Sequence, residues 1–410
     1  MEKKKVITIL SDAPFLPTGY SNQAKQLVKY LEDEGHECHW LANAYVGATM
    51  DGMKLDDGTQ FKCKIYGSSF GQDYFANTMS MHLKETKTDI FIILLDTFML
   101  YPWFLNIDTS PAKTYFWFPS DGGGGMPKGC ENILRKVDCP VAMAKFGQKQ
   151  VGDYYGIKTE YIPHGVDSKR FYRLPESQRN ELRIRWGLND KFVIGVVARN
   201  QPRKNLDRTI KTMALLRDKI PNAVLLLHLD PNDPAQQMFN IPSLIQRYNL
   251  DNRIVFTGMK AYKGFGWYQM NEVYNLMDCF LLTTSGEGFG IPIIEAMSCE
   301  VPVLATDYTT TQELVKDNQA GLGINLSGCE ETDWSKDLKM TDFECLDGTI
   351  TGSWEVERGF CSIKDAVNKL VYLYKNPEFA KRFGVNGRRA VLEKYDFKLV
   401  AKQWEDLIIK

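Results

Sequence analysis

The stretch TSGEGFGIPIIEAMSCEVPVLATD, residues 284–307, decides the fold of this chain. An apolar run at 279–283 leads into it and predicts a strand. Three alternating glycines follow: Gly286, Gly288 and Gly290. They predict a turn whose backbone can approach a ligand closely, and Pro292 is suited to the first turn of the helix that comes next. Because unpaired N–H groups and the positive end of the helix dipole meet at such a turn, the stretch predicts an anion site.

Two carboxylates flank the turn. Glu287 lies between two of the glycines, and Glu295 lies about one turn into the helix, with seven residues between them. Carboxylates beside an anion site suggest a ligand that carries both phosphate and hydroxyl groups, as a nucleotide sugar does. Glu295 is placed to accept two hydrogens from a ribose diol, although the helix dipole alone also favours a glutamate in a first turn. For Glu287 we expect a hydroxyl-binding role.

The rest of the chain repeats the alternation of short apolar runs and segments of helical period. This pattern is typical of α/β proteins with parallel sheets. Strands are expected at 6–10, 37–41, 62–66, 89–95, 114–118 and 141–143, and then at 192–198, 223–228, 254–257, 279–283, 302–305 and 321–325. With 410 residues the chain is too long for one typical domain, so we expect two.

The expected boundary lies in a charged, Arg-rich segment at 168–190 that separates the two series of strands. We therefore assign the first domain to residues 1–170 and the second to residues 171–392. Within the second domain, residues 327–359 interrupt the alternation with a polar insertion rich in Asp, Glu and Gly. Loops of that length are either functional or mobile.

Composition excludes several classes of protein. The 44% hydrophobic and 25% charged residues are ordinary for a soluble enzyme, and no stretch is apolar for the ~18 residues of a membrane span. Nine cysteines without a Cys-x-x-Cys pair fit a reduced, cytoplasmic protein rather than a disulfide scaffold or a zinc site. The net charge of −1 argues against a globally basic surface for nucleic acid or anionic membranes. No two aspartates are separated by a single residue, so a metal-bridged diphosphate is not supported.

Two cations in the second domain are placed to bind phosphate. Arg199 and Lys204 follow the strand expected at 192–198, so they open on the same edge of the sheet as the turn at 286–290. Two fixed cations near a helix N-terminus suit a diphosphate, whose charge must be balanced as the leaving group departs. A solvated basic loop is the alternative, and it is the commoner case for any single Lys or Arg.

In the first domain, polar groups follow two of the expected strands. The loop at 11–21, which contains Gly19, lies at the carboxyl end of the first strand, where α/β folds place ligands. Asp121 and four glycines follow an aromatic strand, so this aspartate could orient an acceptor or a sugar hydroxyl. The alternative is a turn aspartate that begins a glycine loop. His164 is expected to have a structural role at the junction of the domains.

The motif from Glu287 to Asp307 resembles the signature of the family 4 retaining glycosyltransferases, which have the GT-B fold. Three other segments resemble motifs of that family: residues 18–20 its first phosphate loop, residues 162–167 the end of its first domain, and Arg199 with Lys204 its cation pair. The resemblance extends over nearly the whole chain. It implies an α/β protein of two facing Rossmann-like domains with the active site in the cleft between them, and a final helix within residues 393–410 that crosses back onto the first domain.

By this resemblance, the two acids have different roles. Glu295 would bind the ribose of the donor. Glu287, together with the backbone of Phe289 and Gly290, would hold the donor sugar. Four residues are expected to act in the reaction: Asp121, Glu287, Arg199 and Lys204.

The diphosphate of the donor would lie against Arg199, Lys204 and Gly19. The remaining donor-binding residues are Gly288 and Ile291 in the turn, and Met259 and Lys260, where we expect base preference to be read. No metal and no other cofactor is expected, because the cations would balance the charge of the diphosphate.

The chain departs from the family pattern in two positions and one segment. Asp121 stands where many members have a histidine, so the resemblance implies less about the chemistry on the acceptor side of the cleft. Glu300 stands where a glycine is usual, at the end of a helix. The insertion at 327–359 has no counterpart in the family pattern.

We therefore expect a metal-independent transferase that moves a sugar from a nucleoside diphosphate donor to an acceptor, with retention of the anomeric configuration. The acceptor is open: a polysaccharide, a small molecule, a lipid, a protein or a modified nucleic-acid base. The oligomeric state is also open. One alternative is an NAD-type oxidoreductase, which the strand, glycine turn and helix also suit, although the glycines read G-x-G-x-G rather than G-x-G-x-x-G. The other is a catalytically silent protein that binds nucleotide sugars.

Overall fold

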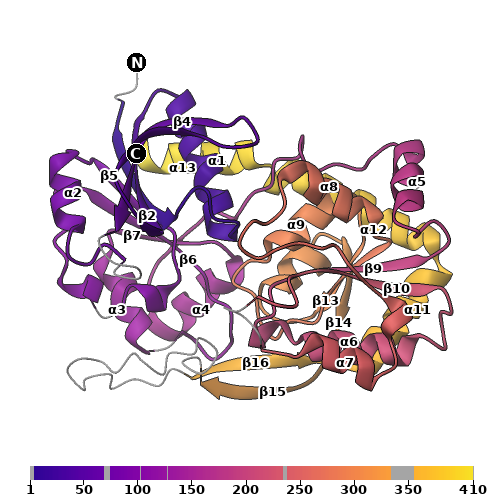
Figure 1. Cartoon of the computed structure of the whole chain (residues 1–410). Coiled ribbons are helices and arrows are strands. Elements are labelled where there is room, and N and C mark those ends of the chain that lie inside the picture. Colours follow the sequence, from indigo (N-terminus) through magenta and orange to yellow (C-terminus); the bar gives the residue numbers. More distant parts are fainter. Residues whose placement is uncertain are drawn as a thin grey trace.

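The computed structural model describes residues 4–68, 74–101, 103–126, 128–233, 238–333 and 355–409. It has two α/β lobes that face each other (Figure 1), each built around its own sheet. The two sheets do not exchange strands. A smaller two-stranded sheet lies beside them.

The first lobe is built on an eight-stranded sheet with the order β3-β4-β2-β1-β5-β6-β7-β8. Its strands are β1 (Val6–Asp12), β2 (Glu37–Val46), β3 (Met50–Lys54), β4 (Gln60–Ser68), β5 (Ile90–Ile93), β6 (Lys113–Phe118), β7 (Cys139–Ala142) and β8 (Glu160–Tyr161). Its helices are α1 (Gly19–Asp33), α2 (Met79–Glu85), α3 (Lys128–Lys136) and α4 (Lys145–Tyr155), with 3-10 turns at Thr97–Met99 and Trp103–Asn106. All neighbouring strands are parallel except β3 and β4.

The second lobe is built on a six-stranded parallel sheet with the order β11-β10-β9-β12-β13-β14. Its strands are β9 (Phe192–Val197), β10 (Ala223–His228), β11 (Ile254–Phe256), β12 (Cys279–Leu282), β13 (Val303–Thr306) and β14 (Gly321–Ile324). Its helices are α5 (Glu176–Arg185), α6 (Leu206–Leu216), α7 (Ile241–Arg247), α8 (Trp267–Leu276), α9 (Ile291–Ser298), α11 (Ile363–Lys375) and α12 (Pro377–Ala390), with 3-10 turns at Pro202–Lys204 and Asp251–Arg253 and π-helical turns at Gln312–Lys316 and Val391–Tyr395.

Both sheets have the strand order of a dinucleotide-binding Rossmann sheet. In the first lobe this order runs β4-β2-β1-β5-β6-β7, and in the second it covers the whole sheet. The order reverses direction between β1 and β5 and again between β9 and β12. Ligands bind at the carboxyl ends of strands at such a reversal, so each lobe presents its binding edge in the loops after these strands.

The C-terminal helix α13 (Phe397–Ile409) returns to the first lobe and packs beside α1 (Figure 1). Its Trp404 is fully buried, with its ring 5.2 Å from that of Trp117 in β6. Where the chain crosses back, it runs beside the segment that leaves the first lobe: the Val166 amide donates to the Tyr395 carbonyl at 2.9 Å. The two lobes are therefore joined by two adjacent chain crossings.

Two segments differ from the sequence-based expectation. The charged segment expected as a connector contains helix α5, because Arg179 and Arg183 are buried and pair with Asp278 at 2.7 and 3.0 Å. Tertiary partners satisfy these charges, which local sequence cannot indicate. The insertion is also not a plain loop: its two ends pair as the antiparallel strands β15 (Leu326–Asp333) and β16 (Glu355–Cys361).

The middle of the insertion, residues 334–354, lies outside the described residues. Its two strands are polar and far apart in sequence, so neither carries a local strand pattern. Four short elements of the first lobe were also not expected from the sequence: β3, β8, α2 and α3.

We predict that Trp404→Ala lowers the free energy of unfolding by about 3–5 kcal/mol, because a large buried side chain leaves a cavity between α13 and β6. Urea unfolding followed by circular dichroism measures the change. Leu399, on the same helix, is 42% exposed, so Leu399→Ala is the control and should change the free energy by less than about 1 kcal/mol. Equal losses in both variants would contradict the packing role of Trp404.

Candidate functional site

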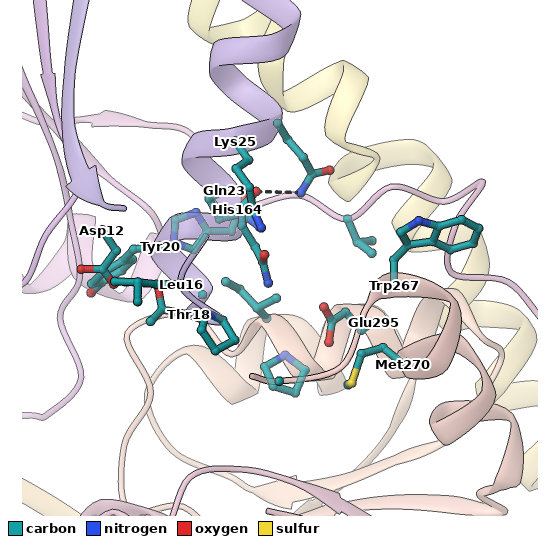
Figure 2. A pocket seen from close by; sticks show the side chains of 18 of the residues that line it. Asp12, Leu16, Thr18, Tyr20, Gln23, Lys25, His164, Trp267, Met270 and Glu295 are labelled. Atoms are coloured by element: carbon teal, nitrogen blue, oxygen red, sulfur yellow. Dashed lines mark hydrogen bonds between the residues drawn. The ribbon is translucent and has the colours of Figure 1, made fainter. Parts of the chain in front are cut away.

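A cleft of about 1970 Å³ lies between the lobes and is lined by the loops after the strands of both sheets (Figure 2). Almost all of the residues predicted from the sequence line it: Gly19, Asp121, Arg199, Lys204, Met259, Glu287, Gly288, Phe289, Gly290, Ile291 and Glu295. Lys260 is exposed and does not line the cleft. The prediction that it reads the base of the donor is therefore not supported by its position.

The Glu287 carboxylate is held by two cations at the base of the turn at residues 286–290, which we call the donor turn after the role predicted for it. It is 3% exposed, and its oxygens lie 2.5 Å from Lys204 Nζ and 3.0 Å from an Arg203 nitrogen. Burial alone would raise the pKa of this carboxyl, but the Lys204 and Arg203 charges outweigh burial and lower the pKa to about 2. Glu287 is therefore ionised at neutral pH.

Arg203 is a site residue that the sequence did not single out. Its guanidinium also lies 3.4 Å from Asp121 Oδ2, so it bridges a carboxylate of each lobe. Arg199, by contrast, is exposed at the cleft, and its guanidinium donates to the Pro17 carbonyl at 3.5 Å. The sequence placed three basic residues in one loop after β9, but only the tertiary structure shows which of them reaches Glu287.

Glu295 projects from helix α9 into the cleft (Figure 2). The Tyr274 hydroxyl donates a hydrogen bond of 2.5 Å to its Oε2. Burial raises the pKa of Glu295 to about 7, although the bond from Tyr274 acts in the opposite direction. Its remaining oxygen is the group that can accept hydrogens from a ligand in the cleft.

Two helix N-termini meet across the cleft. Thr18 caps α1, accepting a hydrogen bond from the Ser21 amide at 3.1 Å, and donates to Asp12 at 2.6 Å. A Cβ added at Gly19 would lie only 3.1 Å from the Ile291 side chain at the start of α9. Helix N-termini attract anions, so this arrangement suits a phosphate group.

The glycines of the donor turn have a role that the sequence did not reveal. A Cβ at Gly286 would lie 1.8 Å from the Asp121 carbonyl oxygen, and one at Gly288 would lie 2.6 Å from Pro119 Cβ. These two glycines therefore make room for the first-lobe loop after β6. The close approach that they permit is between the lobes, in addition to any approach by a ligand.

Asp96 is a second cleft residue that the sequence reasoning missed. It follows β5, between the strands that end near Asp12 and Asp121, and it lines the cleft. The Tyr20 hydroxyl donates to it at 2.6 Å, and burial raises its pKa to about 6. The signal in the sequence was an aspartate just after an apolar run, as at Asp121.

His164 lies under the donor turn. It is 1% exposed, and its ring packs 4.3 Å from that of Trp117 and 5.3 Å from that of Phe289. Burial lowers its pKa to about 3, so the ring is neutral. Among the described residues neither ring nitrogen has a hydrogen-bond partner.

Within the described ranges, no group of three or more His, Cys, Asp or Glu side chains is arranged to hold a metal ion. In the same part of the chain, no helix is long and apolar enough to cross a membrane.

Comparison with known proteins finds similarity to glycosyltransferases in the second lobe. Residues 178–330 match the family described as glycosyl transferases group 1. These residues, in the second lobe, are thus similar to the group 1 glycosyltransferases, and the chain as a whole has the GT-B fold. It is 30% identical over 172 residues to the GDP-mannose-dependent alpha-(1-6)-phosphatidylinositol monomannoside mannosyltransferase of Mycolicibacterium smegmatis. That match covers 40% of this chain and 43% of the relative, so it spans less than half of that curated protein.

Two solved structures show how far the fold is shared. Sucrose-phosphate synthase from Thermosynechococcus elongatus matches with a TM-score of 0.73 and 17% identity, over 99% of this chain and 98% of that one. Anabaena Alr3699/HepE, solved in complex with UDP-glucose, matches with a TM-score of 0.70 and 16% identity, over 99% of both chains. The whole two-lobed GT-B architecture is thus shared, including the first lobe, which the family match does not cover.

The raised pKa of Glu295 predicts a pH effect on stability. The native carboxyl, with a pKa of about 7, holds its proton more tightly than the unfolded one, whose pKa is about 4.3. Its contribution is therefore present at acidic pH and lost as the pH rises toward 7 and above. We expect the melting temperature to fall further in wild type than in Glu295→Gln when the pH rises from 5.5 to 8. Differential scanning fluorimetry measures it.

Glu378 is exposed, so Glu378→Gln is the control. Its melting temperature should change with pH in the same way as that of wild type. If the pH curves of wild type and Glu295→Gln run parallel, Glu295 does not titrate as described.

Proposed function

We propose that the protein is a retaining, metal-independent glycosyltransferase that transfers a sugar from a nucleoside diphosphate donor to an acceptor bound against the first lobe. The observation that carries the proposal is the Glu287 network: a buried carboxylate in the donor turn, joined to Lys204 and Arg203 beside two helix N-termini. This arrangement offers fixed positive charge for a diphosphate and an ionised acid for sugar hydroxyls on the same side of the cleft.

In this proposal, the departing diphosphate lies between Arg199, Lys204 and the N-terminus of α1 at Gly19. Negative charge grows on the leaving oxygen as the glycosidic bond breaks, and fixed cations stabilise it without a metal ion. Arg199 supports this role because it lines the cleft and makes no ion pair within the described residues.

The two acids of the donor turn have different tasks. Glu295 accepts hydroxyl hydrogens from the ribose, which its place one turn into α9 and its cleft-facing side chain support. Glu287, with the backbone of Phe289 and Gly290, holds hydroxyls of the sugar. Gly288 and Ile291 complete the turn. We assign contact with the base to Met259, which its position in the lining of the cleft supports.

On the acceptor side, Asp121 and Asp96 line the cleft at the ends of adjacent strands. Both carboxyls can accept a hydrogen bond from an acceptor hydroxyl. In this proposal the transfer takes place on the front face with retention, and the departing phosphate takes the acceptor proton.

The donor class is supported by similarity. Anabaena Alr3699/HepE was solved with UDP-glucose, and the relative from Mycolicibacterium smegmatis is named as GDP-mannose-dependent. Both names describe nucleoside diphosphate sugars. The family match also favours transfer over the alternative of an NAD-type oxidoreductase.

Incubation with UDP-glucose, UDP-N-acetylglucosamine, GDP-mannose and ADP-glucose tests the proposal. We expect slow release of nucleoside diphosphate from at least one donor, because water can replace the acceptor, and no change when EDTA is added. Release is measured with a coupled nucleotide assay, and Lys204→Ala purified in parallel is the control for contaminating hydrolases. Tight binding of NADH with no binding of UDP, GDP or ADP would overturn the proposal, and inertness with every donor would favour the silent binding protein.

The division of roles between the acids predicts two different phenotypes. Glu295→Ala should weaken nucleoside diphosphate binding about 10- to 100-fold, the effect of losing hydrogen bonds to a charged group. Glu287→Gln should leave that affinity nearly unchanged and reduce turnover of the bound donor. Glutamine is chosen at 287 because alanine would leave the buried Lys204 without its carboxylate partner and Arg203 with Asp121 alone.

Isothermal titration with UDP and GDP measures the affinities, and release of nucleoside diphosphate measures turnover. Equal loss of affinity in both variants would refute the division.

A further inference from the structure

The hairpin β15–β16 is rooted in the second lobe and reaches the first. In the chain it follows β14 and precedes α11, both of which belong to the second lobe. At its root, Arg208 of α6 donates to the Cys361 carbonyl at 2.7 Å. In Figure 1 the hairpin lies at the lower edge of the second lobe, and one end of it reaches toward the first lobe. The family match ends at residue 330, so β16 lies beyond it.

Strand β16 pairs with the glycine loop of the first lobe. The Gly123 amide donates to the Glu357 carbonyl at 2.9 Å, and the Glu357 amide donates back to the Gly123 carbonyl at 3.2 Å. The Tyr308 hydroxyl, which donates to Glu357 Oε1 at 2.7 Å, also accepts from the Gly123 amide at 3.1 Å. Val356, 4% exposed, is buried in the hydrophobic cluster of the first lobe. The contact is therefore both hydrogen-bonded and apolar.

Arg358 connects this contact to the site. Its guanidinium is almost fully buried, donates to the Asp121 carbonyl at 2.5 Å and lies 3.4 Å from Asp121 Oδ1. The other carboxylate oxygen, Oδ2, lies 3.4 Å from Arg203. Asp121 is thus held between two guanidinium groups, one from the hairpin and one from the loop after β9.

Among the described residues of the hairpin, none of β15 or β16 lines the cleft. Arg358 therefore bears on the cleft through its neighbours: it holds Asp121, and its guanidinium lies next to Gly286, where an added Cβ would come within 2.9 Å of it. The loop that contains Asp121 also packs closely against the donor turn. Its Asp121 carbonyl occupies the space that a side chain at Gly286 would need.

We propose that the hairpin is a clasp between the lobes and that Arg358 is a positioning residue, which holds the Asp121 loop against the donor turn and orients the Asp121 carboxylate in the cleft. The catalytic part of this inference rests on the proposed function, since it assumes that Asp121 faces the acceptor. The clasp does not, because it concerns only the contact between β16 and the loop after β6.

Hydrogen exchange measured by mass spectrometry tests the clasp without any substrate. Arg358→Ala should increase exchange in the peptides that cover residues 119–126 and 355–359, and leave the strands of the second sheet unchanged. Arg208→Ala is the matched control, since it removes an arginine that binds the hairpin root inside the second lobe. It should leave exchange at residues 119–126 as in wild type.

The effect on the reaction separates positioning from stability. For Arg358→Ala we expect UDP and GDP affinities within about twofold of wild type, because the hairpin does not line the donor site, and turnover of the donor lowered about 10- to 100-fold, as for a misplaced reacting group. Arg358→Lys should recover part of the turnover, since it keeps the charge but not the planar fork.

Unchanged exchange at residues 119–126 in Arg358→Ala, or an equal increase in Arg208→Ala, overturns the clasp. A parallel loss of nucleotide affinity and turnover overturns the positioning role.

If Arg358→Ala does not fold, Tyr308→Phe replaces it, because it removes the hydroxyl bonded to Gly123 and Glu357 without unpairing a buried charge. Unchanged exchange at residues 119–126 in Tyr308→Phe also counts against the clasp. If wild type is inert with every donor, the proposed function fails, and the exchange data still decide the clasp.

Discussion

The buried charge of Glu287 is the constraint on which the site depends. An ionised carboxylate that is 3% exposed is stable only when cations and hydrogen-bond donors replace the water it has lost. Lys204 and Arg203 supply that replacement, and removing one partner of such a buried pair typically costs about 3–5 kcal/mol. The donor turn and the loop after β9 therefore hold each other in place.

The same network extends across the cleft. Arg203 reaches Asp121, and Asp121 in turn is bound by Arg358 of the hairpin, so a chain of alternating charges joins the second lobe to the first and back again. Because this network joins the two lobes, a change in their relative position would also move Asp121 relative to Glu287. An isolated lobe would leave at least one of these buried charges without its partner.

Several residues show where sequence reasoning was sufficient. Short apolar runs predicted the strands of both sheets except β3 and β8, because buried parallel strands must be apolar on both faces. Pro292 and the glycines before it indicated the start of α9, and the prediction of a helix on the first lobe at the C-terminus followed from a family resemblance. The charged helix α5 shows the opposite case, since Arg179 and Arg183 look solvent-exposed until Asp278 is placed beside them.

The sequence by itself determined the α/β architecture, the turn with Glu287 and Glu295, and the set of polar residues at the carboxyl ends of strands. These features are local, because periodicity, turn chemistry and helix termini depend on neighbouring residues. Only the tertiary structure decided that Arg203 rather than Arg199 binds Glu287, that Asp96 lies beside Asp121, and that Gly286 makes room for the other lobe. Those facts depend on contacts between segments that are not neighbours in sequence. Arg203 and Glu287 are 84 residues apart, and Asp121 and Arg358 are 237 apart, and no local pattern encodes such pairings.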